Sequence, residues 1–133
     1  KGADTVEVKR LFSDSIDTYK AKYQMVSGAE IFNSCAIASA DENCSDIRVA
    51  SAQAADELLG IQGVNASFVM YPAGGGINIS ARSLGSVNVQ VIMEALGGGG
   101  HQTMAGAQLP GVTMEEAREK LVGLISDLNF PVD

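Results

Sequence analysis

Four consecutive glycines, Gly97–Gly100, stand directly before His101, the one histidine of the chain. Glycine enters φ > 0 conformations readily and has no Cβ to obstruct a ligand. Successive N–H groups in such a loop can converge on an anion, and an adjacent imidazole adds a directional donor or a proton source. A flexible hinge after a helix is the alternative, but a helix end needs one glycine and not four. The segment therefore predicts phosphate recognition, and we expect a side chain at Gly99 to block backbone approach and to resist φ > 0.

Arg82 and Ser83 form a second candidate for phosphate chemistry, at the end of an expected strand over residues 76–83. Loops at strand ends are where α/β folds place ligands. The planar fork of Arg suits phosphate oxygens, and Ser adds a hydroxyl donor. A short expected helix over residues 86–96 returns the chain to the sheet, so we expect these residues and Gly97–Gly100 to flank one cleft. The alternative is a surface Arg paired with a carboxylate.

The other potentially reactive side chains do not indicate a catalytic centre within this chain. A dinuclear hydrolytic metal centre needs several converging Asp, Glu or His ligands, and the single histidine with no Asp/His cluster predicts no such site here. Glu115, Glu116 and Glu119 fit the start and the solvated face of a helix, where acidic residues complement the helix dipole. Cys35 falls in an expected strand without a basic neighbour in sequence, which is typical of a small core residue rather than a nucleophile.

Composition sets the broad class of the protein. The 133 residues are 46% hydrophobic, enough for one domain with a core. The net charge of −7 argues against non-specific binding to a nucleic-acid backbone, although it leaves room for a local phosphate pocket. Two cysteines are typical of a reducing compartment. With no apolar run near the ~20 residues of a membrane span and no apolar segment behind Lys1, we expect a cytoplasmic domain, cut from a longer chain.

Hydrophobic spacing and turn residues predict the elements that would position these groups. The leading helix, over residues 4–26, carries an apolar stripe (Leu11, Phe12, Ile16, Tyr19), which we expect to pack on a neighbouring chain or to stay exposed. The later elements are a strand at 29–39, a helix at 46–59, strands at 66–72 and 76–83, a helix at 86–96, a strand at 104–109 and a helix capped by Thr113 and Glu116. The fold class is therefore α/β, a single domain with a mixed β-sheet flanked by helices (β-α-β-β-α-β-α) after a leading helix.

Several segments together resemble the carboxyl-terminal, DHH-associated substrate-binding domain of the DHH phosphoesterase superfamily. They are Ile79-Ser80-Ala81-Arg82-Ser83, Val87-Asn88-Val89-Gln90-Val91-Ile92, Gly97-Gly98-Gly99-Gly100-His101 and Ala105-Gly106. The resemblance spans nearly the whole chain and is strongest to the cyclic-di-AMP phosphodiesterases of Gram-positive bacteria. Residues 2–12 resemble the helix that links the two catalytic lobes of that family. We therefore expect an interlobe linker helix at 1–27 and the substrate-binding domain at 28–133.

The resemblance also implies residue roles and partners. Gly98, Gly99, Gly100 and His101 would contact the substrate phosphate, with Arg82 and Ser83 beside them, and His101 would be a catalytic residue that stabilises developing charge. No metal ligands are implied in this chain, because Mn²⁺ would be held by an amino-terminal lobe with an Asp-His-His motif. That DHH lobe of the same polypeptide would be a partner, and the parent protein would be membrane-anchored at its amino end. Residues 102–104 depart from the usual family pattern, which leaves base or sugar preference open.

Taken together, these features predict the substrate-binding half of a manganese-dependent phosphodiesterase that acts on cyclic-di-AMP or short oligonucleotides. The isolated chain is expected to be inactive, and a homodimer through the leading helix is one further expectation. Related branches share the glycine-histidine motif, so part of an oligoribonuclease or exopolyphosphatase-like phosphatase is one alternative. A non-catalytic nucleotide- or nucleic-acid-binding module is the other.

Overall fold

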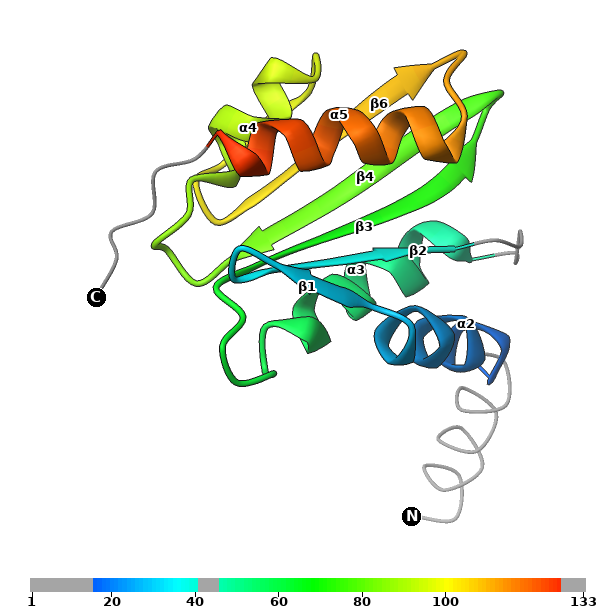
Figure 1. Cartoon of the computed structure of the whole chain (residues 1–133). Helices are drawn as coiled ribbons and strands as arrows, with labels where there is room; N and C mark the ends of the chain where they lie inside the picture. Colours follow the sequence, from blue (N-terminus) through cyan, green and yellow to red (C-terminus); the bar gives the residue numbers. More distant parts are fainter. Residues whose placement is uncertain (1–15, 41–45, 128–133) are drawn as a thin grey trace.

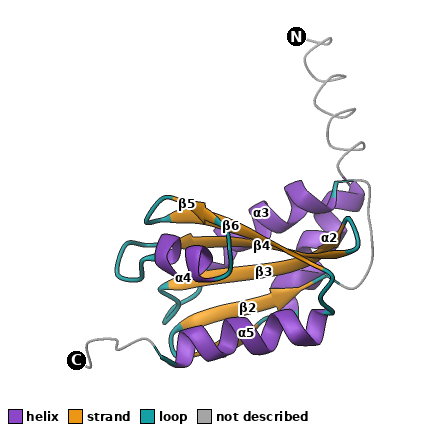
Figure 2. Cartoon of the chain, turned by 90° about the horizontal axis from the view of Figure 1, so that it is seen from above, coloured by secondary structure: helices purple, strands orange, loops and turns teal. Residues whose placement is uncertain are grey.

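The computed structural model describes residues 16–40 and 46–127, which fold as a six-stranded mixed sheet between two layers of helices (Figures 1 and 2). This arrangement confirms the expected α/β class. The strands are β1 (Glu30–Phe32), β2 (Cys35–Ser39), β3 (Ala66–Ala73), β4 (Gly76–Ser83), β5 (Gly99–Gly100) and β6 (Met104–Pro110). The helices are α2 (Ile16–Ser27), α3 (Ile47–Leu58), α4 (Val89–Ala95) and α5 (Met114–Ser126).

The strand order across the sheet is β1-β2-β3-β4-β6-β5. Strands β2 and β3 are parallel, and α3 makes the crossover connection that a parallel pair requires. The other neighbouring pairs are antiparallel. The turn between β3 and β4 uses the positive φ values of Gly74 (54°) and Gly75 (82°), as the glycine-rich connection in the sequence predicts.

The single strand expected over residues 29–39 is wrong, because the chain forms the hairpin β1–β2 there. Asn33 and Ser34 lie at its turn with φ of 54° and 64°, the left-handed region that a two-residue type I′ turn requires at both positions. The Asn33 side chain donates a hydrogen bond to the carbonyl of Ile125 at 3.1 Å. That bond fixes the turn against the end of α5.

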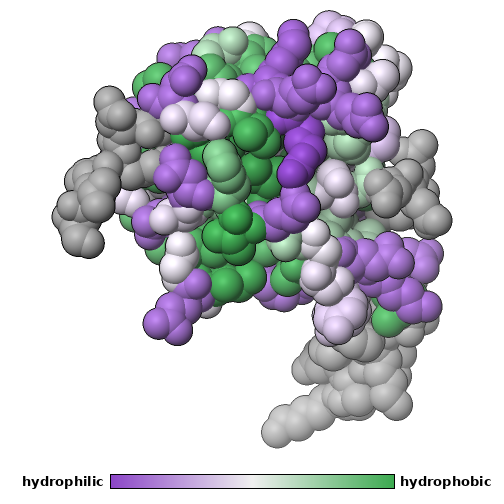
Figure 3. Space-filling model, in the orientation of Figure 1, coloured by the Kyte–Doolittle hydropathy of each residue, from purple (hydrophilic) through white to green (hydrophobic). Residues whose placement is uncertain are grey.

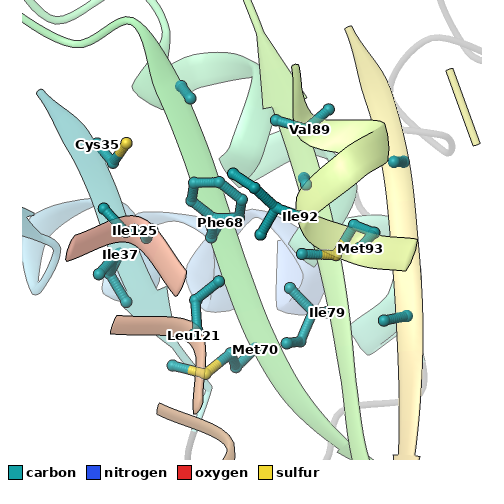
Figure 4. Packing of buried hydrophobic residues seen from close by; sticks show 14 of the residues in the cluster. Cys35, Ile37, Phe68, Met70, Ile79, Val89, Ile92, Met93, Leu121 and Ile125 are labelled. Atoms are coloured by element: carbon teal, nitrogen blue, oxygen red, sulfur yellow. The ribbon is translucent and has the colours of Figure 1, made fainter. Parts of the chain in front are cut away.

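One face of the sheet is sealed by α4 and α5. Phe68 lies at the centre of this core, between Ile92 of α4 and Leu121 of α5 (Figure 4). Thr113 begins α5 with a complete capping box to Glu116, as expected from the sequence. The buried residues of this face come from every long strand and both helices: Cys35, Ile37, Ala66, Phe68, Met70, Ile77, Ile79, Ala81, Val87, Val89, Ile92, Met93, Ala105, Ala107, Leu109, Ala117, Leu121 and Ile125.

The other face is covered by α2 and α3, through a second cluster that is rich in alanine. The Ser67 hydroxyl on β3 donates to the carbonyl of Ala55 at 2.6 Å, which holds α3 close to the sheet. Met25 is the buried anchor of α2, whereas Ile16, Tyr19 and Tyr23 lie exposed on its outer side. That exposure agrees with the expectation for part of the apolar stripe. Leu11, Phe12 and residues 41–45 lie outside the described residues.

Candidate functional site

A groove of about 1190 Å³ lies on the face of the sheet that α3 covers. Helix α3 packs on β3 and reaches only part of β4, so the outer strands leave their polar side chains uncovered. The groove floor is formed by β4 and β6, one wall by α3, and the opposite wall by the start of the glycine segment. The residues that carry the argument are Asn78, Ser80, Arg82, Gln108, Arg48 and Asp56.

Arg82 points into this groove because side chains alternate along β4. Ile79 and Ala81 belong to the core under α4 and α5, so Ser80 and Arg82 face α3. The Arg82 Nε donates to Asp56 Oδ1 at 3.1 Å, and its Nη1 donates to the carbonyl of Ala81 at 3.0 Å. The alternative interpretation, an Arg paired with a carboxylate, is therefore confirmed. Arg82 also lines a groove, and its contact with phosphate stays a prediction.

Ser83 does not join Arg82 in the groove. One residue further along β4, its side chain faces the opposite side of the sheet and is buried. The Ser83 hydroxyl accepts a hydrogen bond from the N–H of Gly85 at 2.9 Å, which shapes the turn after the strand. Its backbone N–H donates to the carbonyl of Thr103 at 3.0 Å and ties that turn to the β5–β6 connection. The expected common cleft therefore holds Arg82 without the Ser83 hydroxyl.

The glycine segment begins as a helix end and continues as a strand. Gly97 has a φ of 89°, and its N–H donates to the carbonyl of Glu94, so it fills the expected position after the helix. The N–H of Gly98 donates to the carbonyl of Met93 at 2.7 Å. Both glycines line the groove, but these two N–H groups are already hydrogen-bonded. Gly99 and Gly100 then form β5 on the edge of β6.

Close backbone approach explains two of these glycines. A Cβ at Gly98 would overlap the carbonyl oxygen of Gly106 on β6. A Cβ at Gly100 would overlap the backbone of Ala105, and its φ of 145° also disfavours a side chain. Gly99 has open space around that position and no left-handed φ, so the expected conformational reason for a glycine there is wrong.

His101 is aligned with Arg82 across the strands, with Met104 of β6 between them. Its backbone exchanges two hydrogen bonds with Met104, at 2.6 and 3.3 Å, and Met104 is the direct partner of Arg82 on β4. Two strand spacings therefore separate the backbones of Arg82 and His101, about 10 Å. His101 is exposed, and it stands beyond the residues that line the groove.

Sequence reasoning missed the wall that α3 contributes. Arg48, Ala52 and Asp56 recur every four residues on one side of the helix, and all three line the groove. Arg48 adds a second cation, and Asp56 holds Arg82. The four-residue repeat was visible in the sequence, but nothing in it indicated that this side of the helix faces β4.

The described residues do not fit a manganese centre. Within residues 16–40 and 46–127, no group of three or more His, Cys, Asp or Glu side chains is placed to hold a metal ion. Cys35 is fully buried, and burial raises the pKa of its thiol to about 11. A thiolate is thus disfavoured at Cys35, which confirms its interpretation as a core residue. Among the helices in the described part of the chain, none is long and apolar enough to cross a membrane.

Comparison with known proteins gives one consistent family. Residues 34–128 match the DHHA1 domain. The chain is 50% identical over 129 residues to the cyclic-di-AMP phosphodiesterase GdpP of Geobacillus thermodenitrificans, which covers 96% of this chain and 20% of GdpP. It therefore spans about a fifth of the length of that relative.

Two solved structures share the fold. An exopolyphosphatase-related protein from Bacteroides fragilis superposes with a TM-score of 0.75 at 23% identity, over 84% of this chain and 35% of that one. RecJ from Thermus thermophilus, solved in complex with Mn²⁺, superposes with a TM-score of 0.68 at 15% identity, over 95% of this chain and 19% of RecJ. At these identities the likeness concerns the fold.

Proposed function

Because this chain belongs to the DHHA1 domain family of DHH phosphoesterases, we propose that it binds the substrate of a phosphodiesterase that hydrolyses cyclic-di-AMP or short oligonucleotides. The observation that carries this proposal is the common groove of Arg82 with Gly97 and Gly98, on one face of the sheet. The identity to a cyclic-di-AMP phosphodiesterase over almost the whole chain supports the substrate class.

The proposed site takes its phosphate contacts from the ends of β4 and β5, which lie on either side of β6. Arg82 supplies a guanidinium that faces the groove, and His101, aligned with Arg82 across the strands, supplies an imidazole. We place Gly98, Gly99 and Gly100 along the path of the phosphate, because Gly98 lines the groove, Gly99 has open space where a Cβ would stand, and Gly100 continues the same edge strand. Ser83 acts in this proposal through its backbone, which holds the neighbouring turn.

Catalysis then requires a second lobe. We propose that Mn²⁺ is held by a DHH lobe in the same polypeptide, in line with the Mn²⁺ complex of RecJ. Residues 1–27 would link the lobes, and the exposed Ile16, Tyr19 and Tyr23 on α2 would contact that lobe or a second copy of the chain. The parent protein would be membrane-anchored, with this domain in the cytoplasm.

The role of Arg82 is tested in an enzyme reconstituted with a DHH lobe. Arg82→Ala should cost the transition state about 2–4 kcal/mol in kcat/KM, as for the loss of one preorganised donor. Arg118→Ala is the matched control, because Arg118 is exposed on α5 and pairs with Glu30 away from the groove. Equal effects of the two substitutions would contradict the proposed site. His101→Ala should lower kcat more than it raises KM.

A separate experiment tests whether this chain alone lacks catalytic activity and needs the DHH lobe. The isolated chain, incubated with Mn²⁺ and cyclic-di-AMP, should give no linear product, because its described residues provide no metal centre. The reconstituted enzyme should give product under the same conditions. Metal-dependent turnover by the purified chain would overturn the two-lobe proposal, whereas binding without turnover in both preparations would favour a non-catalytic module.

A further inference from the structure

The groove carries little net charge for a phosphate site. Among its described lining residues, the charged side chains are Arg48, Arg82 and Asp56, two positive and one negative, which sum to +1. A phosphodiester carries one negative charge, whereas a terminal phosphate, with a second pKa of about 6, carries nearly two above neutral pH. The rest of the polar floor consists of neutral amides and a hydroxyl, from Asn78, Gln108 and Ser80.

We propose that Asp56 reduces the preference of this cationic groove for dianionic terminal phosphates relative to monoanionic phosphodiesters. The inference rests on the proposed function, in which the groove holds a phosphate beside Arg82. Asp56 acts through charge, as a specificity-determining residue, and it also positions the guanidinium. Since each cleavage of a phosphodiester creates a terminal phosphate, the same carboxylate weakens binding of the product and favours its release.

The geometry places the carboxylate where a ligand must meet it. Asp56 Oδ1 lies 3.1 Å from Arg82 Nε, and the Arg82 side chain is only 14% exposed, so little of the guanidinium is open to a phosphate. Asp56 is 64% exposed at the groove wall. A phosphate that reaches Arg82 therefore comes within several ångströms of a negative charge. The repulsion scales with the charge of the ligand, so a dianion is penalised about twice as much as a monoanion.

The position of Asp56 does not favour helix stability. It lies in the last turn of α3, which contains no basic residue, and a carboxylate there opposes the helix dipole. Its neighbour Glu57 shares this last turn but pairs with Lys22 of α2 and does not line the groove. The two adjacent carboxylates thus form a natural pair for comparison, one in the groove and one outside it.

The test uses this chain and two ligands that differ in charge and by one methyl group, AMP and its 5′-methyl phosphate ester. Affinities are measured by NMR titration at constant ionic strength and about pH 8, where AMP is dianionic and the ester stays monoanionic. Asp56→Asn keeps an oxygen that accepts the Arg82 hydrogen bond and removes the charge. We expect it to raise the ratio of AMP affinity to ester affinity about three- to tenfold, the range for one screened unit charge at this separation. Glu57→Gln should leave the ratio unchanged.

The outcomes separate the two proposals. If wild-type chain binds both ligands in the groove and Asp56→Asn leaves the ratio unchanged, the selectivity role of Asp56 is wrong and the proposed function stands. The same conclusion follows if Glu57→Gln shifts the ratio equally, because the effect would then be one of overall charge. If neither ligand perturbs the groove resonances of the wild-type chain, the proposed function fails and the role of Asp56 with it. If Asp56 served only to position Arg82, Asp56→Asn would change the affinities for AMP and for the ester by the same factor, and their ratio would stay constant.

Discussion

The two faces of the sheet are built from the same strands, but one face is buried in a core and part of the other lines a groove. Along β4, Ile77, Ile79 and Ala81 enter the core beneath α4 and α5, while Asn78, Ser80 and Arg82 stay at the groove. The first face is sealed by two helices. The second is covered over β2 and β3 but open over β4 and β6, because α3 reaches only part of the sheet. Incomplete coverage of one face thus creates the groove, and the sealed face lies directly beneath its floor.

The sealed face also has exposed apolar side chains at its edge, on the strand β1. Figure 3 shows hydrophobic surface over β1, where Ile31 and Phe32 are exposed, beside the more polar surface of α5. The edge strand β1 is only three residues long, and Glu30 pairs with Arg118 of α5. A short, charged edge strand limits pairing with another sheet.

Removing a central side chain from the sealed face should give the largest effect on stability. Phe68→Ala deletes a fully buried ring between α4 and α5, and we expect a loss of about 3–5 kcal/mol in the free energy of unfolding. Denaturant titration measures it. Ser80→Ala on the groove floor is the control, expected to change stability by about 0.5 kcal/mol or less. Similar losses for both would refute the distinction between the faces.

A smaller effect should separate two adjacent glycines at the rim of the groove. Gly98→Ala forces a Cβ against the carbonyl of Gly106, so we expect a loss of about 1–3 kcal/mol in unfolding free energy. Gly99→Ala meets open space and should cost far less. Thermal or denaturant unfolding of the two variants checks this order, and a Gly99 variant as unstable as the Gly98 variant would contradict the β5–β6 packing.

The smallest effect concerns the pH dependence of the sealed face. Burial raises the pKa of Cys35 from 9.0 to about 11, so its contribution to stability is fully present below pH 9 and is lost as the pH rises towards 11. Between about pH 8 and pH 10 the unfolded state ionises first, and the wild type should lose roughly 1 kcal/mol more than Cys35→Ala. Denaturant titrations at both pH values measure the difference. Parallel losses in the two proteins would show that Cys35 ionises equally in both states.

The sequence by itself determined the features that depend on local spacing. The period of two along residues 76–83 placed Arg82 with Asn78 and Ser80, opposite the core residues, before any fold was known. The capping box of Thr113 and the helix end at Gly97 are likewise short-range patterns. The expected phosphate chemistry of Arg82 and His101 came from residue type and from the family resemblance, and it remains a prediction.

Only the tertiary structure decided the features that depend on contacts between distant segments. Asp56 precedes Arg82 by 26 residues, and no local pattern pairs them. The glycine segment pairs with β6 as an edge strand, so close backbone contact, more than conformational freedom, requires glycine at Gly98. The groove itself exists because α3 is held over β3 by the bond from Ser67 to Ala55 and stops short of β6. Helix placement over a sheet follows from packing across the whole core, which spacing along the chain does not encode.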